Sequence, residues 1–516
     1  MAKRRQARYR WSREEGQVNS VKMAERISLA SVLSLLAIPL TLGVGIAISL
    51  YNPLYAVIVA GALVVGIILL LRQDEFVVML IVAVHILVDA YLGFAVYQIA
   101  LLMALILLAV CYLGRSADRP WSRPRLLWLW LLFLILTIFP TLKGGVFSLT
   151  NSIGFYLEIV LSPFVMFWLG NVIAKDMSAM RRVFQFLAIM AAIFAIHTII
   201  EANTGIFLFE SARAKANLFQ ATNFQLGNGA TSRVGSFFGN PNGNGIFLAT
   251  SFFLPLGLFI ESKQFWAKMT YLLEMLAILL ALMYTYSNGS WVAALVGLVA
   301  FMFLVGHVRY SVLLCLFMLA LAAIAFVVFP SQIAVQISHA RDQGDLSLHF
   351  ADWQTALRVI AAYPLFGVGL GSQAYLTLSN PYRVLAQTKP LAEPDNSYLQ
   401  WGAMAGIPVM LLFLLMLGIV FWFSWRNWLS VEARYRPLLA GGIVALIALS
   451  VNSLSVDGWT SPIDVQFLGW LIAGVVTSPF IGCCLSRRPQ PAIDRMAESG
   501  HSQFGVPWID KARQEV

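Results

Sequence analysis

Five ionisable residues occupy two polar segments of an otherwise apolar sequence, and their side chains suit proton transfer and anion binding. Arg233 lies in the first segment, and Arg341, His349, Asp352 and Asp395 lie in the second. An imidazole or a carboxylate can take a proton from a hydroxyl group, and a guanidinium can hold an anion through two parallel hydrogen bonds. The elements that carry these residues decide whether they meet.

The segment from Leu346 to Ala362 is predicted to be an amphipathic helix. Its apolar residues recur at steps of three and four, at Leu346, Phe350, Trp353, Leu357 and Ile360. If this stripe packs on the protein, His349 and Asp352 face the protein and Arg358 faces water. Gly367, Gly369 and Gly371 follow Pro364, but they lack a Walker lysine and follow a helix, so a tight turn is favoured over a nucleotide site.

Two further motifs are polar and contain possible helix caps. Asp395 and Asn396 stand at the start of a predicted helix, where one Asp or Asn normally accepts hydrogen bonds from free backbone N–H groups. The run from Ser232 to Gly245 is glycine-rich and precedes an apolar segment. From the residues alone, Arg233 in this run is equally well explained as a solvated interfacial residue.

The composition indicates whether these segments belong to a soluble protein or to a membrane protein. Of 516 residues, 59% are hydrophobic and 12% are charged, whereas soluble proteins average about 25% charged. The apolar runs are continuous for about 20 residues, which is typical of membrane helices and differs from the alternating pattern of a β-barrel. A soluble enzyme and a disordered chain are therefore excluded. No soluble domain with a basic face is present, so the net charge of +10 predicts no nucleic-acid partner.

The distribution of charge predicts the topology. The first 26 residues hold eight Lys and Arg against three Glu, and further basic residues occupy alternate connections, as the positive-inside rule requires. We expect an all-α polytopic membrane protein with about 14 transmembrane helices and both termini in the cytoplasm. The predicted order is a basic N-terminus at 1–26, seven spans at 27–200, an outer loop at 201–243, four spans at 244–330, a large outer loop at 331–397, three spans at 398–482 and a cytoplasmic tail at 483–516.

Ionisable residues inside the predicted spans are candidates for function, because burying them in a membrane is unfavourable. His197 and Glu201 lie one helical turn apart and close the seventh span near the outer surface, whereas Glu274 lies alone in its span. The four cysteines show neither a disulfide framework nor metal-ligand spacing.

Three motifs together resemble the bacterial O-antigen ligase and O-antigen polymerase superfamily. They are the run from Arg233 to Asn242, the series Trp353, Pro364 and Gly367-Val-Gly369, and Asp395-Asn-Ser-Tyr-Leu followed by Ala-Gly-Ile-Pro. The resemblance extends over about 230–420 and rests on the order of the motifs and on their place in the two outer loops. It implies a membrane glycosyltransferase of GT-C-like architecture, with a large periplasmic loop before the twelfth span.

The resemblance also implies a reaction and the residues that perform it. The donor is a glycan linked to undecaprenyl diphosphate, and the acceptor is a glycan or a lipid-linked molecule at the periplasmic face of the bacterial cytoplasmic membrane. Arg233 and Arg341 are expected to hold the diphosphate, and Asp395 or His349 is expected to take the proton of the acceptor hydroxyl. Supporting roles, in substrate binding or in structure, fall to Asn240, Asn242, Asp352, Asn396 and Tyr398. No metal or other cofactor is expected.

The sequence departs from the common family pattern at two positions. Ligases usually have His where Asp395 stands, and many members have Arg where His349 stands, so the two residues can have exchanged roles. This departure favours a polymerase of O-antigen or exopolysaccharide. The alternative is a ligase that transfers glycan to a lipid A-core or protein acceptor, and a polysaccharide transporter or flippase is the third and least favoured class.

Overall fold

The computed structural model describes the chain from the fifth predicted span onward, with gaps. The described residues are 125–204, 225–226, 231–238, 240–306, 343–384, 391–460 and 463–483, with single positions at 82, 316, 327, 330 and 334. All of them belong to one of the two units into which the chain divides, Val82–Val516. The ranges 27–50, 54–71 and 96–114, which hold predicted spans, lie outside the described residues, as do nearly all of 76–92 and 310–330.

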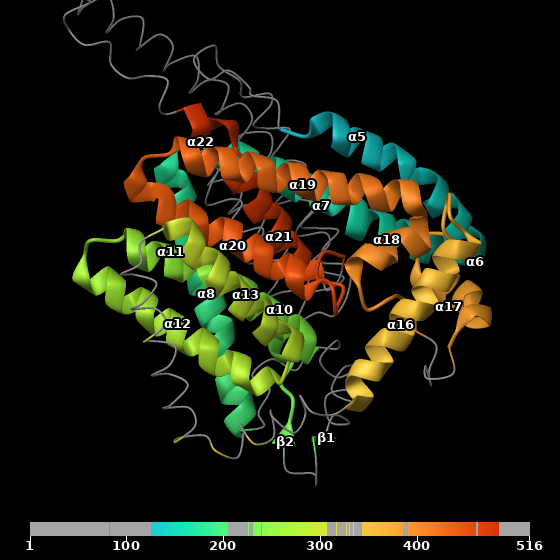
Figure 1. Ribbon diagram of the computed structural model, residues 1–516, viewed down its shortest axis with the longest axis horizontal. Coiled ribbons are helices and arrows are strands. Elements are labelled where there is room, and N and C mark those ends of the chain that lie inside the picture. Colours follow the sequence, from blue (N-terminus) through green and yellow to red (C-terminus); the bar gives the residue numbers. More distant parts are fainter. Residues whose placement is uncertain are drawn as a thin grey trace, which may run out of the picture. The chain divides into compact units, whose positions relative to one another are not determined.

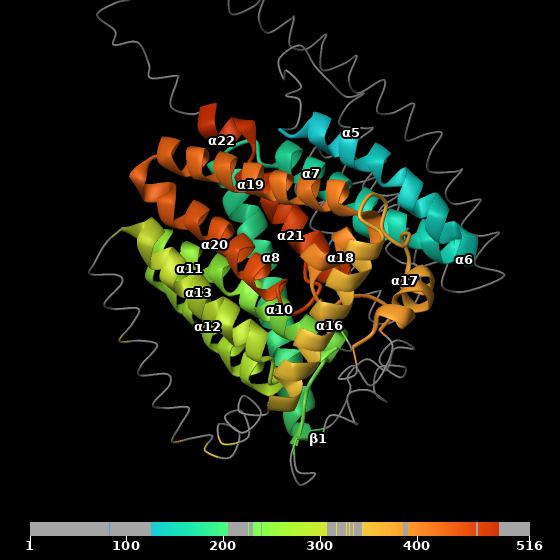
Figure 2. The same cartoon turned by 45° about the vertical axis from the view of Figure 1, so that its right-hand side comes forward.

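The described part is helical apart from one short hairpin, as the sequence predicts (Figures 1 and 2). The first helices are α5 (Leu127–Leu136), α6 (Ile138–Tyr156), the π-helical turn η1 (Leu157–Leu161), α7 (Ser162–Ile173) and α8 (Met177–Thr204). The hairpin pairs β1 (Gln225–Leu226) with β2 (Thr231–Ser232) in antiparallel register, and the 3₁₀ turn η2 (Ser236–Phe238) follows it.

The remaining helices follow in three groups. The first is α10 (Pro241–Ser251), α11 (Phe253–Glu261), α12 (Phe265–Thr285) and α13 (Asn288–Val305). The second is α16 (Gln343–Ala362), α17 (Ser372–Ser379) and the 3₁₀ turn η3 (Asn380–Tyr382). The third is α18 (Ser397–Ala405), α19 (Ile407–Ser430), the 3₁₀ turn η4 (Ala433–Tyr435), α20 (Arg436–Asn452), α21 (Ile463–Val476) and α22 (Pro479–Cys483).

Seven helices of the described part are long and apolar enough to cross a membrane. They are Leu127–Ile173, Met177–Thr204, Pro241–Glu261, Phe265–Thr285, Asn288–Val305, Ile407–Ser430 and Ala433–Asn452. Leu127–Ile173 is an unusually long run, in which Thr137, the irregular residue Ser148 and the π turn interrupt the α-helix. These helices confirm a polytopic α-helical protein, whereas the total of about 14 spans stays a prediction.

The last three spans were predicted to begin at residue 398, but the first apolar helix long enough to cross a membrane in this region is Ile407–Ser430. Gly406 adopts φ 94°, which ends α18, and α19 starts with Ile407 and Pro408. A Cβ at position 406 would lie 2.3 Å from the carbonyl oxygen of Leu365, so only glycine fits this close approach. The break separates the short helix α18 from the membrane-spanning helix α19. The motif at 395–398 therefore lies at the start of a separate short helix.

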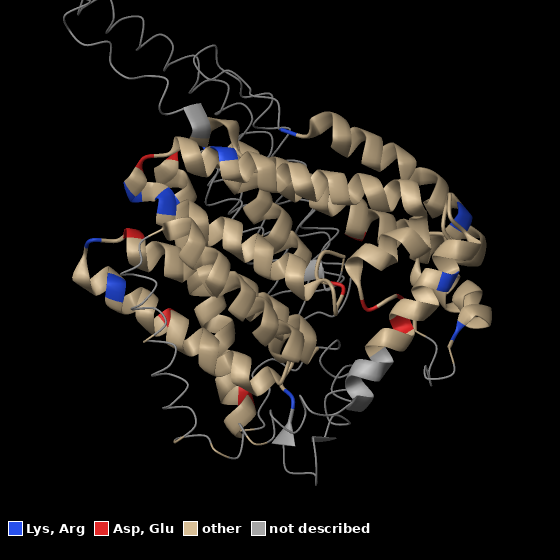
Figure 3. Cartoon of the chain, viewed as in Figure 1, with Lys and Arg blue, Asp and Glu red and all other residues tan. Residues whose placement is uncertain are grey.

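Connections that were predicted to share the cytoplasmic side are joined by hydrogen bonds at one end of the bundle. Asn427 at the end of α19 donates to the carbonyl oxygens of Val476 and Ser478, at 2.8 and 3.0 Å. Ser478 donates in turn to the carbonyl oxygen of Ala174, between α7 and α8. Arg181 of α8 pairs with Glu261 of α11. Figure 3 shows Lys and Arg gathered around the α11–α12 and α19–α20 connections, on the side away from α16 and α18.

An aromatic core joins α5, α7, α18, α19 and α21. The ring centroids of Trp130 and Trp470 are 4.8 Å apart, as are those of Trp459 and Trp470. Phe133 of α5 contacts Trp401 of α18 edge to face, with centroids 4.9 Å apart. Such buried aromatic pairs stabilise a fold beyond the area that they bury. The core therefore anchors α18, although this helix is too short to span a membrane.

The glycine run after Pro364 forms the tight turn that the sequence predicts. Its backbone lies between α6 and α18, since Val368 N–H donates to Ala403 and Leu370 N–H donates to Pro140, both at 2.8 Å. Gly369 has φ 115°, and a Cβ there would lie 2.6 Å from the backbone nitrogen of Gly144. The glycines serve close packing of two backbones.

We expect Gly369→Ala to destabilise the protein, because the substitution combines a positive φ, worth roughly 1–3 kcal/mol of strain, with a backbone clash. The melting temperature of the purified protein in detergent should fall by several degrees. Gly418→Ala is the matched control, because no atom lies within 4 Å of a Cβ at that helical position. Equal melting temperatures of the two variants would contradict the packing role.

Candidate functional site

Arg233, the predicted diphosphate ligand of the first outer segment, is held by the end of α12. Its Nε donates to the carbonyl oxygen of Thr285 at 3.0 Å, and Nη2 donates to Asn242 Oδ1. The neighbouring Val234 N–H donates to the carbonyl oxygen of Tyr284 at 3.1 Å. Only 7% of the Arg233 surface is exposed, so these contacts fix the plane of the guanidinium.

Asn240 and Asn242 form hydrogen bonds that fix the region around Arg233. Asn240 is the N-cap of α10, and its side chain accepts a hydrogen bond from the Asn242 backbone N–H at 2.9 Å. The side chain of Asn242 accepts from Arg233. The predicted supporting roles thus have a structural basis: one asparagine starts the helix, and the other orients the arginine.

Helix α16 confirms the predicted amphipathic segment but not its predicted buried face. Phe350 and Leu357 are 48% and 52% exposed, so the predicted stripe of large apolar residues does not pack on the protein along its whole length. The buried face combines Ile360 of that stripe with Ala351, Asp352, Thr355, Ala356 and Val359. Small side chains bring this face close to its neighbours, a signal that a search for large apolar residues misses. Asp352 is buried and Arg358 is exposed, as predicted.

The motif at 395–398 separates a capping residue from a candidate catalytic residue. Asn396 is the N-cap of α18, since its Oδ1 accepts from the backbone N–H groups of Tyr398 and Leu399, both at 3.0 Å. Its Nδ2 donates to the carbonyl oxygen of Leu454 at 2.7 Å. Tyr398 donates its hydroxyl to Ser450 in α20 at 2.8 Å. Both residues therefore support the structure, and the N-cap of α18 is Asn396 rather than Asp395.

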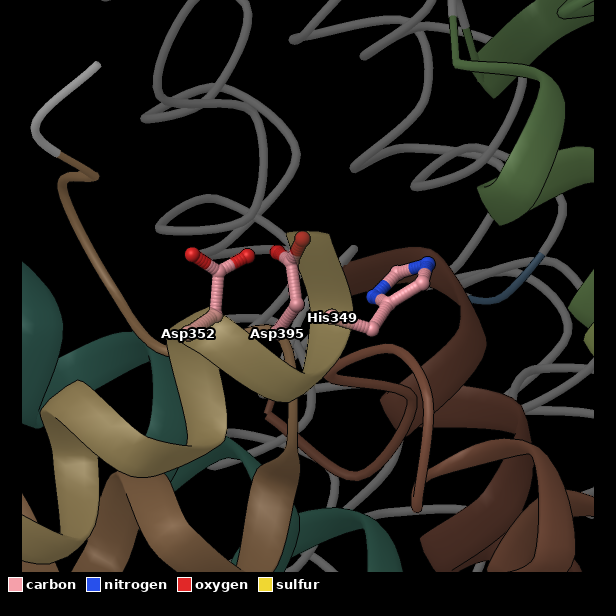
Figure 4. A group of neighbouring side chains, drawn as sticks. All are labelled: His349, Asp352 and Asp395. Atoms are coloured by element: carbon pink, nitrogen blue, oxygen red, sulfur yellow. The ribbon is translucent and has the colours of Figure 1, made fainter. Parts of the chain in front are cut away.

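His349, Asp352 and Asp395 come together from two elements that are distant in the sequence. One nitrogen or carboxylate oxygen of each lies within 4.8 Å of the others. Figure 4 shows the side chains of His349 and Asp352, which project from α16, beside the side chain of Asp395, which precedes α18. Nδ1 of His349 is buried and has no hydrogen-bond partner within the described residues. An imidazole flanked by two carboxylates can accept a proton, and the same donor set can approach one divalent cation.

Two residues that the sequence prediction missed border this cluster. Burial raises the pKa of Tyr375 in α17, and the charges of Asp352 and Asp395 raise it further, so the phenol keeps its proton. Burial and the charge of Asp395 raise the pKa of Glu393 to about 7, against the hydrogen bond that Gln400 donates. Glu393 was visible two residues before Asp395, whereas no sequence pattern marks Tyr375.

A series of polar contacts places the Arg233 and Asp395 segments at the same end of the bundle. Thr285 accepts from Arg233, and its hydroxyl also accepts from Ser287 N–H. Ser287 contacts Ser290, which contacts Asn452 of α20. The next residue, Ser453, accepts from Ser397 N–H at 3.1 Å. Arg341 lies outside the described residues, so its predicted position stays a prediction.

These features define a polytopic membrane protein whose ionisable candidate site lies at one end of its helices. Residues 273–414 match the family model described as O-antigen ligase. The match confirms the resemblance to the O-antigen ligase and polymerase superfamily, and with the apolar helices it supports a membrane glycan-processing enzyme. It includes His349, Asp352 and Asp395, whereas Arg233 precedes it. No curated protein matches the chain.

The pKa of Glu393 predicts how pH changes the stability of the protein. In the unfolded chain the pKa of a glutamate is about 4.3, whereas in the folded protein the pKa of Glu393 is about 7. Between these values the folded protein retains a proton that the unfolded chain has released, so the free energy of unfolding falls as pH rises. We expect Glu393→Gln, which cannot ionise, to flatten this dependence.

Melting temperatures of the purified protein at pH 5 and pH 8 measure the effect. Glu432→Gln, at an exposed position outside the site, is the matched control and should leave the wild-type dependence unchanged. Parallel curves for wild type and Glu393→Gln would contradict the prediction.

Proposed function

We propose that this chain is an integral membrane glycosyltransferase that transfers or polymerises glycan from an undecaprenyl-diphosphate-linked donor. The reaction takes place at the periplasmic face of the bacterial cytoplasmic membrane. The observation that supports this most strongly is the convergence of His349, Asp352 and Asp395 inside the segment that matches the O-antigen ligase family. A proton acceptor thereby lies at the same end of the bundle as the Arg233 segment, where the donor diphosphate would bind.

The arginines act on the leaving group in this proposal. As the bond between the sugar and the diphosphate breaks, its electron pair moves to the diphosphate, where negative charge grows. Arg233 and Arg341 hold that charge by charge-assisted hydrogen bonds. The bonds from Arg233 to Thr285 and Asn242 keep its guanidinium in one orientation before the donor arrives. Preorganised donors of this kind stabilise a transition state without reorganisation.

The cluster of His349 and two carboxylates acts on the acceptor. The acceptor oxygen forms the new bond to the sugar carbon, and its proton moves to His349 or to Asp395. If His349 takes the proton, the neighbouring carboxylates stabilise the imidazolium; if Asp395 takes it, His349 orients the acceptor or contacts the phosphate. Tyr375 keeps its proton and can donate a hydrogen bond at the edge of the cluster.

We further propose that the enzyme is a polymerase of O-antigen or exopolysaccharide. Asp395 stands where ligases usually have His, and this departure favours the polymerase. A ligase that transfers glycan to a lipid A-core or protein acceptor is the second candidate, which the description of the matching family favours. The reaction needs no metal ion in either case, since the arginines supply the positive charge.

Replacing the proposed ligands and bases should reduce glycan transfer without unfolding the protein. We expect losses of at least about tenfold for Arg233→Ala and Arg341→Ala, and of about 10²- to 10⁴-fold for whichever of His349→Gln and Asp395→Asn removes the base. The measurement is release of undecaprenyl diphosphate from lipid-linked repeat units by the protein in nanodiscs.

Arg358→Ala is the matched control, because this exposed arginine lies on α16 away from the buried face that carries Asp352. Activity should also persist in excess EDTA; its loss and restoration by a divalent cation would show that the His349 cluster works with a metal. Near-normal activity of both the Arg233 and Arg341 variants would refute the proposed diphosphate site.

Deleting the gene in its native host separates the two candidate enzymes. Loss of polymer, with single repeat units still attached to the surface lipid, is the result expected for a polymerase. Long chains that accumulate on the undecaprenyl carrier would identify a ligase instead. Unchanged glycans with altered solute uptake would contradict both and identify a transporter. Carbohydrate analysis of the membrane fractions gives the answer.

A further inference from the structure

The turn that follows Arg233 contains a serine in a backbone conformation that normally belongs to glycine. Ser236 has φ 51°, which is one of three positive values at non-glycine residues in the described part of the chain. A residue with a Cβ is strained there by roughly 1–3 kcal/mol, and such strain persists only where surrounding contacts enforce it. The contacts of Ser236 therefore show what this turn is built to hold.

Two buried ionisable residues of α8 bind Ser236. Its Oγ lies 2.7 Å from Nδ1 of His197, with which it shares a hydrogen bond. Its backbone N–H donates to the carboxyl group of Glu201. His197 and Glu201 are one turn apart on α8, with Nδ1 and Oε2 separated by 3.6 Å. The side chain and the backbone of one residue are thus held by neighbouring groups of one helix.

The packing around this contact is otherwise aromatic. The ring of Phe237 lies 4.3 Å from that of His197, and Phe194 of α8 contacts Phe237 and Phe238. His197, Glu201 and Ser236 are all buried. Burying an acid and an imidazole in a membrane protein is unfavourable, and apolar side chains would fill the same space at lower cost. Packing alone does not explain the pair.

Only two residues separate Ser236 from Arg233, and hydrogen bonds on both sides fix the backbone between them. The carbonyl oxygen of Val234 accepts from Asn244 Nδ2 at 3.3 Å, and the same nitrogen donates to Thr198 Oγ1 of α8 at 3.0 Å. The N–H of Val234 donates to Tyr284 on the other side. Helix α8 therefore fixes the turn at Ser236, while α12 fixes the backbone next to Arg233.

We propose that His197 and Glu201 are positioning residues, which hold Ser236 in its left-handed conformation and thereby orient Arg233 toward the diphosphate of the donor. The inference rests on the proposed function, because Arg233 is taken there as a donor ligand. His197 and Glu201 do not touch the donor; they act through the turn. Removing either contact lets the turn relax and displaces the guanidinium.

Binding of undecaprenyl diphosphate to the full-length protein in nanodiscs tests this inference, and no donor sugar needs to be known. We expect Arg233→Ala to weaken binding by about 10- to 100-fold, and Glu201→Gln and Ser236→Gly to weaken it by about tenfold. Ser236→Gly removes the hydroxyl but also the strain, so its melting temperature should not fall. A weaker affinity at unchanged stability separates positioning from folding.

Double variants then show whether the effect passes through Arg233. Adding Glu201→Gln to Arg233→Ala should weaken binding no further, because the group that Glu201 positions is already absent. Glu274→Gln is the matched control: Glu274 is another buried acid, in α12, and its replacement should leave the affinity unchanged.

The outcomes distinguish the two proposals. Normal affinity of Arg233→Ala would refute the donor site itself, and the positioning role with it. Weak binding by Arg233→Ala, combined with normal affinity of both Glu201→Gln and Ser236→Gly, would overturn the positioning role alone. Independent losses that multiply in the double variant would overturn it in the same way.

Discussion

The carbonyl groups at the ends of two helices hold the segments that carry Arg233 and Asn396 in the candidate site. The last carbonyls of any helix lack partners within that helix, and in a membrane protein such groups must find donors inside the protein. At the end of α12, Tyr284 and Thr285 accept from Val234 and Arg233. Just beyond α20, Ser453 and Leu454 accept from the Ser397 backbone and the Asn396 side chain. Two non-helical segments are thereby fixed to the helical bundle.

The candidate site contains both a buried cation and a group of acids. The guanidinium of Arg233 is fixed beside α12, whereas the carboxyl groups of Asp352, Glu393 and Asp395 gather around the start of α18 and the buried face of α16. Burial makes the gathering of these acids unfavourable, and the raised pKa of Glu393, about 7, lessens the negative charge by leaving this group partly protonated at neutral pH. An anionic donor and a hydroxyl acceptor can then approach groups of opposite character.

The sequence predicted those features that depend on local chemistry. The sequence predicted that one of Asp395 and Asn396 caps a helix, and Asn396 is the N-cap of α18; α16 follows from its helical spacing. The stripe of large apolar residues does not mark the buried face of α16, since Phe350 and Leu357 are exposed whereas the alanines are buried. Tyr375 could not be predicted, because its position beside Asp352 depends on the glycine turn that folds α17 back. Such contacts between distant segments leave no periodic signal in a single sequence.

The cap at α18 has a consequence for how this enzyme class can diversify. Asn396 accepts from the N–H groups of Tyr398 and Leu399 and donates to Leu454, while the Ser397 N–H donates to Ser453. These contacts do not use the side chain of residue 395, so a carboxylate or an imidazole at that position leaves them in place. The candidate proton acceptor at position 395 and the helix cap Asn396 are adjacent residues. A substitution at 395 can therefore change the proton acceptor while Asn396 still caps the helix.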